Sequence, residues 1–151
     1  YKRQGLTREA QLKILELTAG KVATIFDSSM GFRHGPKSFI NEKTIMFGFV
    51  NNTPYTRDYD LDILEEVHGD EIAAGVFAIA QPGKRNFSGS TIEYSAETAL
   101  LPDGYLALAD IMVAQTVALL TSIKVGNKPD TPSPTGTVNR VVKGVTIYDY
   151  K

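Results

Sequence analysis

Residues 8–17 read Arg-Glu-Ala-Gln-Leu-Lys-Ile-Leu-Glu-Leu, and this stretch predicts an unusual helix. On a helix that turns by about 100° per residue, Glu9, Lys13 and Glu16 fall within about 60° of one another. Aliphatic residues flank this row on both sides, so the charges occupy a narrow strip between apolar surfaces. Such placement favours partial desolvation, which shifts pKa values and suits proton transfer. A solvated ladder of i,i+3 and i,i+4 ion pairs is the alternative interpretation.

The segments around this helix follow from local composition. Thr7 is predicted as its N-cap and Gly20 as its end. Residues 22–27, Val-Ala-Thr-Ile-Phe-Asp, are rich in β-branched and aromatic side chains and predict a strand. A short helix is expected over residues 36–39, because a proline suits the first helical position.

Further along the chain, strands and helices alternate. The apolar runs 44–50 and 75–80 predict strands that are buried on both faces, and residues 91–94 predict a short strand. Helices are expected over residues 56–68 and 103–124. This alternation predicts the α/β class, as a three-layer α/β/α sandwich on a mostly parallel sheet.

Polar residues follow two of the predicted strands. His34 comes after the first strand, and Asn51-Asn52 comes after the second. Ligands of parallel sheets bind at the carboxyl ends of the strands, so these residues are candidates for ligand contact. Asn51 and Asn52 also precede a helix, whose first N–H groups would bind a hydroxyl or a phosphate; helix capping explains the same residues equally well. His34 has the same two interpretations.

The totals limit the classes of function. The chain has 151 residues, a net charge of −1, no cysteine and two histidines. This length suits one domain, and the charge argues against nucleic-acid or membrane binding. Thiolate and multi-histidine metal sites are excluded, no apolar run reaches the 18 residues of a spanning helix, and a reducing cytoplasm is the expected location. No glycine-rich nucleotide motif is present.

The last part of the chain has a different character. Residues 128–136 are proline-rich and predict an extended linker. A short helix is expected over residues 137–143 and a last strand or arm over 145–148. We therefore interpret residues 1–151 as one domain with a tail arm over 127–151. Because the chain opens at Tyr1, almost on top of a helix, we expect it to be part of a longer protein.

The stretches 8–21 and 31–38, the latter reading Gly-Phe-Arg-His-Gly-Pro-Lys-Ser, resemble a known family. They are similar to the second sugar isomerase (SIS) domain of tagatose-6-phosphate ketose/aldose isomerases, also described as galactosamine-6-phosphate deaminase/isomerases. Residues 54–62 and 129–142 continue the likeness, which covers nearly the whole chain. The resemblance implies a Rossmann-like SIS fold. Residues 1–4 lack the strand and glycine-rich turn with which members open this domain, so its usual first strand is expected to be absent.

The resemblance also implies roles for single residues. Glu16 matches a glutamate that moves a proton between C1 and C2 of the sugar, and Lys13 matches a lysine that stabilises the enediolate oxygen. His34 matches a histidine of ring opening, and Glu9 matches a further active-site acid. Lys143 matches a tail lysine that forms an imine with the ketose; a solvated tail lysine is the alternative. The implied substrates are phosphorylated hexoses or aminohexoses, with no metal or organic cofactor.

Together these inferences predict a phosphosugar isomerase or deaminase that acts through an enediolate. This chain would be its C-terminal SIS domain, inactive alone because the phosphate-binding loop of such proteins lies in a preceding SIS domain. The expected partners are that N-terminal domain and a second copy in a homodimer. The alternative is a non-catalytic SIS module that binds phosphosugars or holds a dimer together.

Overall fold

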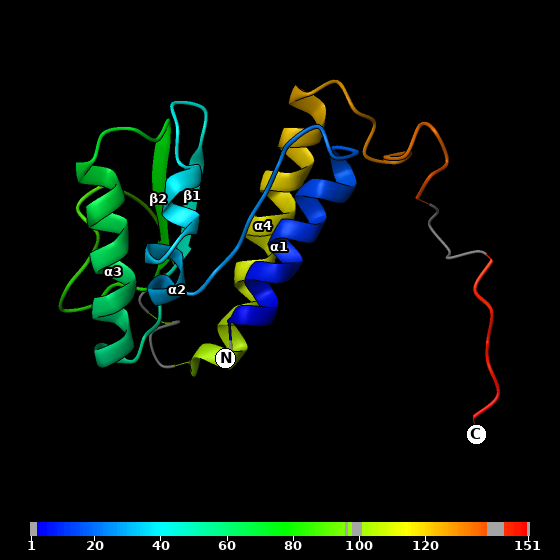
Figure 1. Ribbon diagram of the computed structural model, residues 1–151. Helices are drawn as coiled ribbons and strands as arrows, with labels where there is room; N and C mark the ends of the chain where they lie inside the picture. Colours follow the sequence, from blue (N-terminus) through cyan, green and yellow to red (C-terminus); the bar gives the residue numbers. More distant parts are fainter. Residues whose placement is uncertain (1–2, 96, 98–100, 139–143, 151) are drawn as a thin grey trace.

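Figure 1 shows the computed structural model of the chain, which describes residues 3–95, 97, 101–138 and 144–150. The helices are α1 (Gln4–Leu17), α2 (Ser29–Arg33), the 3₁₀-helix η1 (Pro36–Phe39), α3 (Pro54–Gly69) and α4 (Asp103–Lys124). The strands are β1 (Ile45–Phe49), β2 (Gly75–Ala80) and β3 (Ser90–Glu93). Most of these elements match the sequence predictions within one or two residues.

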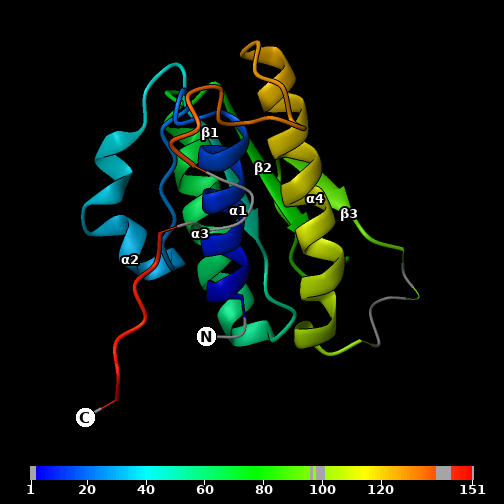
Figure 2. The same ribbon diagram turned by 90° about the vertical axis from the view of Figure 1, so that its right-hand side faces the viewer.

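The described strands form one parallel sheet in the order β1-β2-β3. Phe47 of β1 pairs with Phe77 of β2, and Ile79 of β2 pairs with Ile92 of β3. Helix α3 covers one face of the sheet, and α1 and α4 lie on the other side (Figures 1 and 2). The fold is therefore the three-layer α/β sandwich that the alternating pattern predicts.

The main core lies between α3 and the sheet. Leu61, Leu64 and Val67 of α3 pack against buried strand residues that include Val76 and Ala78. Gly48 of β1 makes close contact possible, because a Cβ at this position would lie 2.7 Å from Leu64 Cδ2. The core therefore fixes the distance between α3 and β1.

Helices α1 and α4 form a parallel pair. Arg3, which precedes α1, binds Asp103 at the start of α4. At the other end, the Asn127 side chain after α4 donates to the carbonyl of Leu17 over 2.7 Å. The contact face of α4 is rich in small buried residues, which let the two backbones approach: Ala114, Ala118 and Ser122.

The outer face of α4 is apolar and exposed. Its large exposed side chains are Tyr105, Leu108, Met112, Leu119, Leu120 and Ile123. By length and composition alone, α4 would be able to cross a membrane, although core helices of soluble proteins meet the same criterion. The absence of a membrane partner therefore stays a prediction.

The structure corrects three predictions in the first part of the chain. Residues 22–27 form no strand; the segment runs beside α1, where the Gln11 side chain donates to the Thr24 carbonyl over 2.7 Å. The first helix begins at Gln4 after Arg3, so Thr7 lies inside the helix, and its hydroxyl donates to the Gln4 carbonyl. The helix ends at Leu17, three residues before the predicted Gly20, which lies in the following turn with a φ of 72° and an N–H that donates to the Leu15 carbonyl.

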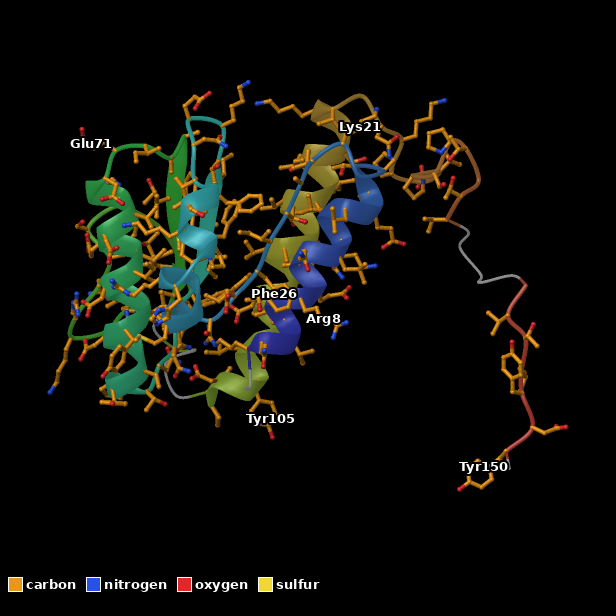
Figure 3. All side chains as sticks on the ribbon, viewed as in Figure 1. Arg8, Lys21, Phe26, Glu71, Tyr105 and Tyr150 are labelled. Atoms are coloured by element: carbon orange, nitrogen blue, oxygen red, sulfur yellow. The ribbon has the colours of Figure 1, made fainter. Side chains whose placement is uncertain are left out.

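Residues 144–150, the last that the structure describes, are all exposed. Residues 145–148, predicted as a strand or arm, form no strand, and Ile147 is exposed. Tyr150 lies far from the helices and the sheet (Figure 3). Residues 139–143, most of the predicted short helix, lie outside the described residues.

Candidate functional site

The charged row of α1 is formed as the sequence predicts. Lys13 Nζ lies 2.8 Å from Glu16 Oε2 and 3.6 Å from Glu9 Oε1. The three side chains are 30%, 36% and 38% exposed for Lys13, Glu16 and Glu9, so they are partly shielded from solvent. The hydrogen bond to Glu16 raises the pKa of Lys13 above its ordinary value. Lys13 is therefore a cation at neutral pH, suited to stabilise negative charge next to a carboxylate base.

A groove lies on the opposite side of α1. Its volume is about 340 Å³, and it is lined by Gln11, Ile25, Phe26, Gly35, Pro36, Ser38 and Phe39. Gln11 is about 140° to 160° away from the members of the charged row around the helix. The groove therefore does not open onto Glu9, Lys13 and Glu16.

His34 caps the C-terminus of α2, and its backbone N–H donates to the Gly31 carbonyl over 3.0 Å. It does not follow a strand, because residues 22–27 form none. Its side chain is exposed, and within the described part of the chain the imidazole makes no hydrogen bond or ion pair. The structure thus does not bring His34 into contact with the charged row of α1.

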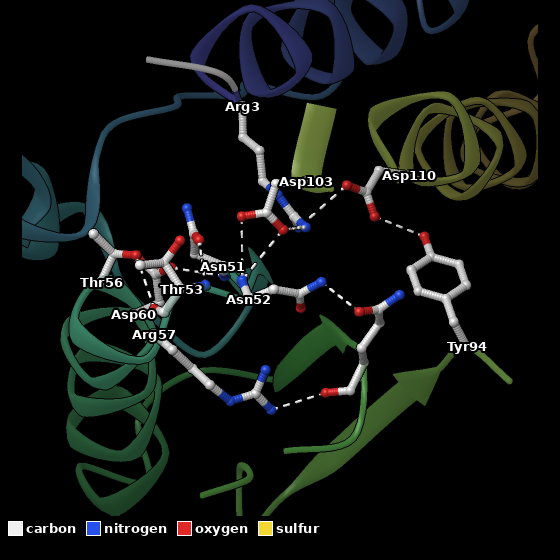
Figure 4. Close-up of polar contacts among 11 residues, drawn as sticks. Arg3, Asn51, Asn52, Thr53, Thr56, Arg57, Asp60, Tyr94, Asp103 and Asp110 are labelled. Carbon is white, nitrogen blue, oxygen red and sulfur yellow. Dashed lines mark hydrogen bonds and ion pairs between the residues drawn. The ribbon is translucent and has the colours of Figure 1, made fainter. Parts of the chain in front are cut away.

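Asn51 and Asn52 follow β1 at the carboxyl edge of the sheet, as predicted. The Asn51 N–H donates to Asp60 over 2.9 Å, and the Asn51 side chain accepts from the Thr53 N–H over 2.9 Å. The Asn52 side chain donates to Gln81, which follows β2. These two residues are therefore held in a polar network that joins the ends of two strands (Figure 4).

This network continues to the two helices on the other side of the sheet. The Asp103 carboxylate accepts from the Asn52 N–H over 3.2 Å and from Arg3 Nη2 over 2.8 Å. Arg3 also lies 3.2 Å from Asp110, which accepts a hydrogen bond from the Tyr94 hydroxyl over 2.7 Å. Figure 4 shows Arg3 reaching from α1 between the two aspartates. The network fixes α1 and α4 relative to the end of β1.

Burial governs the electrostatics of this network. Asp110 is fully buried, and desolvation raises its pKa; burial and the hydrogen bond to Asp110 raise the pKa of Tyr94. Arg3 Nε, Arg3 Nη1 and Asp110 Oδ2 are buried without a well-formed hydrogen bond. Sequence reasoning missed this group. The available signal was Asp110, the one charged residue between the ends of an otherwise apolar helix.

Two further predictions concern Lys143 and metal binding. Lys143, the proposed imine-forming lysine, lies outside the described residues. Among the residues that the structure does describe, there is no group of three or more histidine, cysteine, aspartate or glutamate side chains that would hold a metal ion.

Comparisons with known proteins relate this arrangement to one class. No family model matches the chain. D-galactosamine-6-phosphate deaminase AgaS of Escherichia coli O157:H7 is 48% identical to it, over 98% of this chain and 38% of that protein. The putative D-galactosamine-6-phosphate deaminase AgaS of Streptomyces coelicolor is 41% identical, over 96% of this chain and 38% of that protein. The chain thus spans well under half the length of these curated relatives.

Solved structures show which proteins share this fold. The tagatose-6-phosphate ketose/aldose isomerase of Escherichia coli matches 99% of this chain and 37% of its own, with a TM-score of 0.83 and 41% identity. A putative tagatose-6-phosphate ketose/aldose isomerase of Clostridium novyi NT matches 98% of this chain and 39% of its own, with a TM-score of 0.85 and 42% identity. The chain therefore has an α/β fold of the sugar isomerase type. Over nearly all of its length, it is similar to one part of proteins named tagatose-6-phosphate ketose/aldose isomerases and D-galactosamine-6-phosphate deaminases.

Proposed function

We propose that this chain is the C-terminal SIS domain of a phosphosugar isomerase or deaminase that acts through an enediolate. The names of its relatives support a phosphorylated hexose or aminohexose as substrate, of the tagatose 6-phosphate or galactosamine 6-phosphate type. The observation that carries the proposal is the 2.8 Å contact between Lys13 Nζ and Glu16 Oε2. A base and a fixed cation side by side are what proton transfer between two adjacent carbons requires.

Each residue has a distinct role in this proposal. Glu16 moves the proton between C1 and C2, while Lys13 stabilises the enediolate oxygen. Glu9, which also faces Lys13, helps to hold the ammonium in place. His34 opens the sugar ring, with an exposed imidazole available to a substrate. Asn51 and Asn52 contribute to substrate binding at the carboxyl edge of the sheet, and Lys143 reacts with the ketose from the tail.

One observation favours the alternative, a module that binds phosphosugars or holds a dimer together without turnover. His34 and the groove beside it lie apart from the charged row of α1. In the catalytic proposal, parts of the protein beyond this chain complete the site around Glu16. An N-terminal SIS domain and a second copy of the chain are the proposed sources of those parts.

Proton exchange in heavy water distinguishes the two functions. We expect the full-length protein to exchange hydrogen with solvent at C1 of tagatose 6-phosphate, or at C2 of galactosamine 6-phosphate, measured by NMR. Glu16→Gln abolishes this exchange if Glu16 is the base. Glu42→Gln, at an exposed position, is the matched control and leaves exchange unchanged. Binding of these sugars without any exchange would support the non-catalytic module instead.

A further inference from the structure

The turn that carries His34 is held by a single carboxylate of α3. Arg33 Nη1, directly before the histidine, donates to Glu66 Oε2, and Lys37 Nζ, three residues after it, donates to Glu66 Oε1 over 2.6 Å. Each oxygen of Glu66 thus binds one side of the turn. Asp70, which directly follows α3, adds a second partner for Lys37 at 2.7 Å.

The other end of α2 is attached to the same helix. The Ser29 hydroxyl donates to Asp60 Oδ1, and Asp60 Oδ2 accepts the Asn51 N–H. Between these attachments, Phe32 packs against the core. A helix of five residues is too short to be stable by itself, so its position depends on such contacts with α3.

These contacts involve the neighbours of His34 but not its ring. The backbone of the turn is fixed by Arg33 and Lys37, while the exposed imidazole is left without a hydrogen bond among the described residues. A general acid or base needs such an arrangement, because its orientation has to be set without occupying its nitrogen atoms.

The ionisation states of Glu66 and Lys37 keep the His34 turn attached to α3 near neutral pH. The hydrogen bond from Lys37 lowers the pKa of Glu66, and the contacts with Asp70 and Glu66 raise the pKa of Lys37. Both groups are therefore ionised at neutral pH. Arg33 and Lys37 already have partners and are poorly placed to bind a substrate phosphate.

We propose that Glu66 is a positioning residue, which holds the His34 turn in the orientation needed for opening the sugar ring. This inference rests on the proposed function, because ring opening is part of it. Glu66 acts through the backbone between Arg33 and Lys37, and not by contact with the substrate.

The test compares two substrates in the full-length protein. One is tagatose 6-phosphate, which forms a ring through its 5-hydroxyl; the other is its 5-deoxy analogue, which cannot close this ring. We expect Glu66→Gln to lower kcat for tagatose 6-phosphate by about tenfold, with less than about a twofold change for the analogue. His34→Ala shows the same selectivity with a larger loss, and the double variant is no worse than His34→Ala.

The matched control is Glu65→Gln, because Glu65 lies on the same helix but binds the Ser88 N–H and hydroxyl at 2.7 and 2.5 Å. We expect this variant to change neither rate by more than about twofold. Arg33→Gln removes one of the two contacts between the turn and Glu66. We expect it to lower kcat for tagatose 6-phosphate by less than Glu66→Gln does, again with little change for the analogue. This variant replaces Glu66→Gln in the test if Glu66→Gln folds poorly. Equal losses on both substrates, or no loss on the cyclic one, would overturn the role of Glu66. If the unmodified protein turns over neither of these compounds nor galactosamine 6-phosphate, the proposed function itself is refuted.

Discussion

Arg3 and Asp110 form an ion pair inside the molecule, with Arg3 Nη1 3.2 Å from Asp110 Oδ2. Their side chains are 10% and 0% exposed, respectively. Arg3 also binds Asp103 at 2.8 Å, so removing Asp110 takes away part of the charge compensation of a buried guanidinium, which is more costly than the pair itself is stabilising. This pair also fixes the start of α1, the helix that carries Glu9, Lys13 and Glu16.

Asp110→Asn is therefore expected to lower the free energy of unfolding by about 3 kcal/mol. The loss arises because buried Arg3 loses one of its two carboxylate partners and keeps Asp103 alone among the described residues. Urea unfolding followed by circular dichroism measures it. Asp58→Asn is the control, since Asp58 is 58% exposed and lies 3.5 Å from Arg85; we expect a change below about 0.5 kcal/mol there. Equal effects at the two positions would contradict the buried pair.

Tyr94 makes stability depend on pH in the alkaline range. Burial raises the pKa of Tyr94 above its ordinary value, so above about pH 10 the unfolded chain loses this proton more readily than the native protein. The free energy of unfolding then falls as the pH rises, by at most about 1.4 kcal/mol per pH unit. Tyr94→Phe removes this contribution to the pH dependence of the free energy of unfolding, which is measured by urea unfolding at several pH values between about pH 9 and 11. Tyr105→Phe, at an exposed tyrosine, leaves the slope as it was.

Gly48→Ala tests the contact between β1 and α3. The added methyl group would lie 2.7 to 3.0 Å from three atoms of the Leu64 side chain, so we expect a loss of about 1–3 kcal/mol in the free energy of unfolding. For Gly5→Ala we expect the opposite effect, an increase in the free energy of unfolding. Nothing lies within 4 Å of a Cβ at this position of α1, and alanine favours a helix over glycine by up to about 1 kcal/mol. Thermal unfolding of both variants measures these two effects. Stabilisation by Gly48→Ala would contradict the close packing of β1 against Leu64.

Lys13→Gln tests the cation beside Glu16. If the ammonium stabilises an enediolate, we expect kcat of the full-length protein to fall by about 10²-fold or more, with a smaller effect on KM. Because the pKa of Lys13 is raised, the loss of its proton should not limit activity below about pH 10. Lys21→Gln is the control, since Lys21 is exposed and, among the residues that the structure describes, its side chain donates to the Val125 carbonyl alone. A loss confined to KM would assign Lys13 to substrate binding alone.

The parts of the fold that depend on local pattern could be predicted from the sequence. Helix α4 and strand β2 have the predicted bounds, because a long apolar helix and a short apolar run between polar residues are strong local signals. Residues 22–27 carry an equally strong strand signal, yet Gln11 holds their backbone beside α1. Side-chain contacts between distant parts of the chain decided this case, and local composition contains no information about them.

The candidate site likewise has one part that the sequence predicts and one part that depends on tertiary contacts. The row of Glu9, Lys13 and Glu16 follows from helical spacing, and it forms as predicted. The pairing of Arg3 with Asp103 and Asp110 joins residues about a hundred positions apart, so no spacing rule would reveal it. The attachment of Arg33 and Lys37 to Glu66 is likewise a tertiary contact. Helical spacing thus predicts which charged side chains lie together on α1. It does not predict the tertiary partners of Arg3, Arg33 and Lys37.

The exposed apolar face of α4 has a practical consequence for work with this chain in isolation. Side chains such as Leu108, Met112 and Ile123 are 74%, 61% and 58% exposed, and contiguous surfaces of this kind associate with one another in water. Light scattering should therefore detect particles that grow with protein concentration. Lysine substitutions at Leu108 and Met112 would be the first choice for obtaining a monodisperse sample, since neither residue belongs to the buried contact with α1.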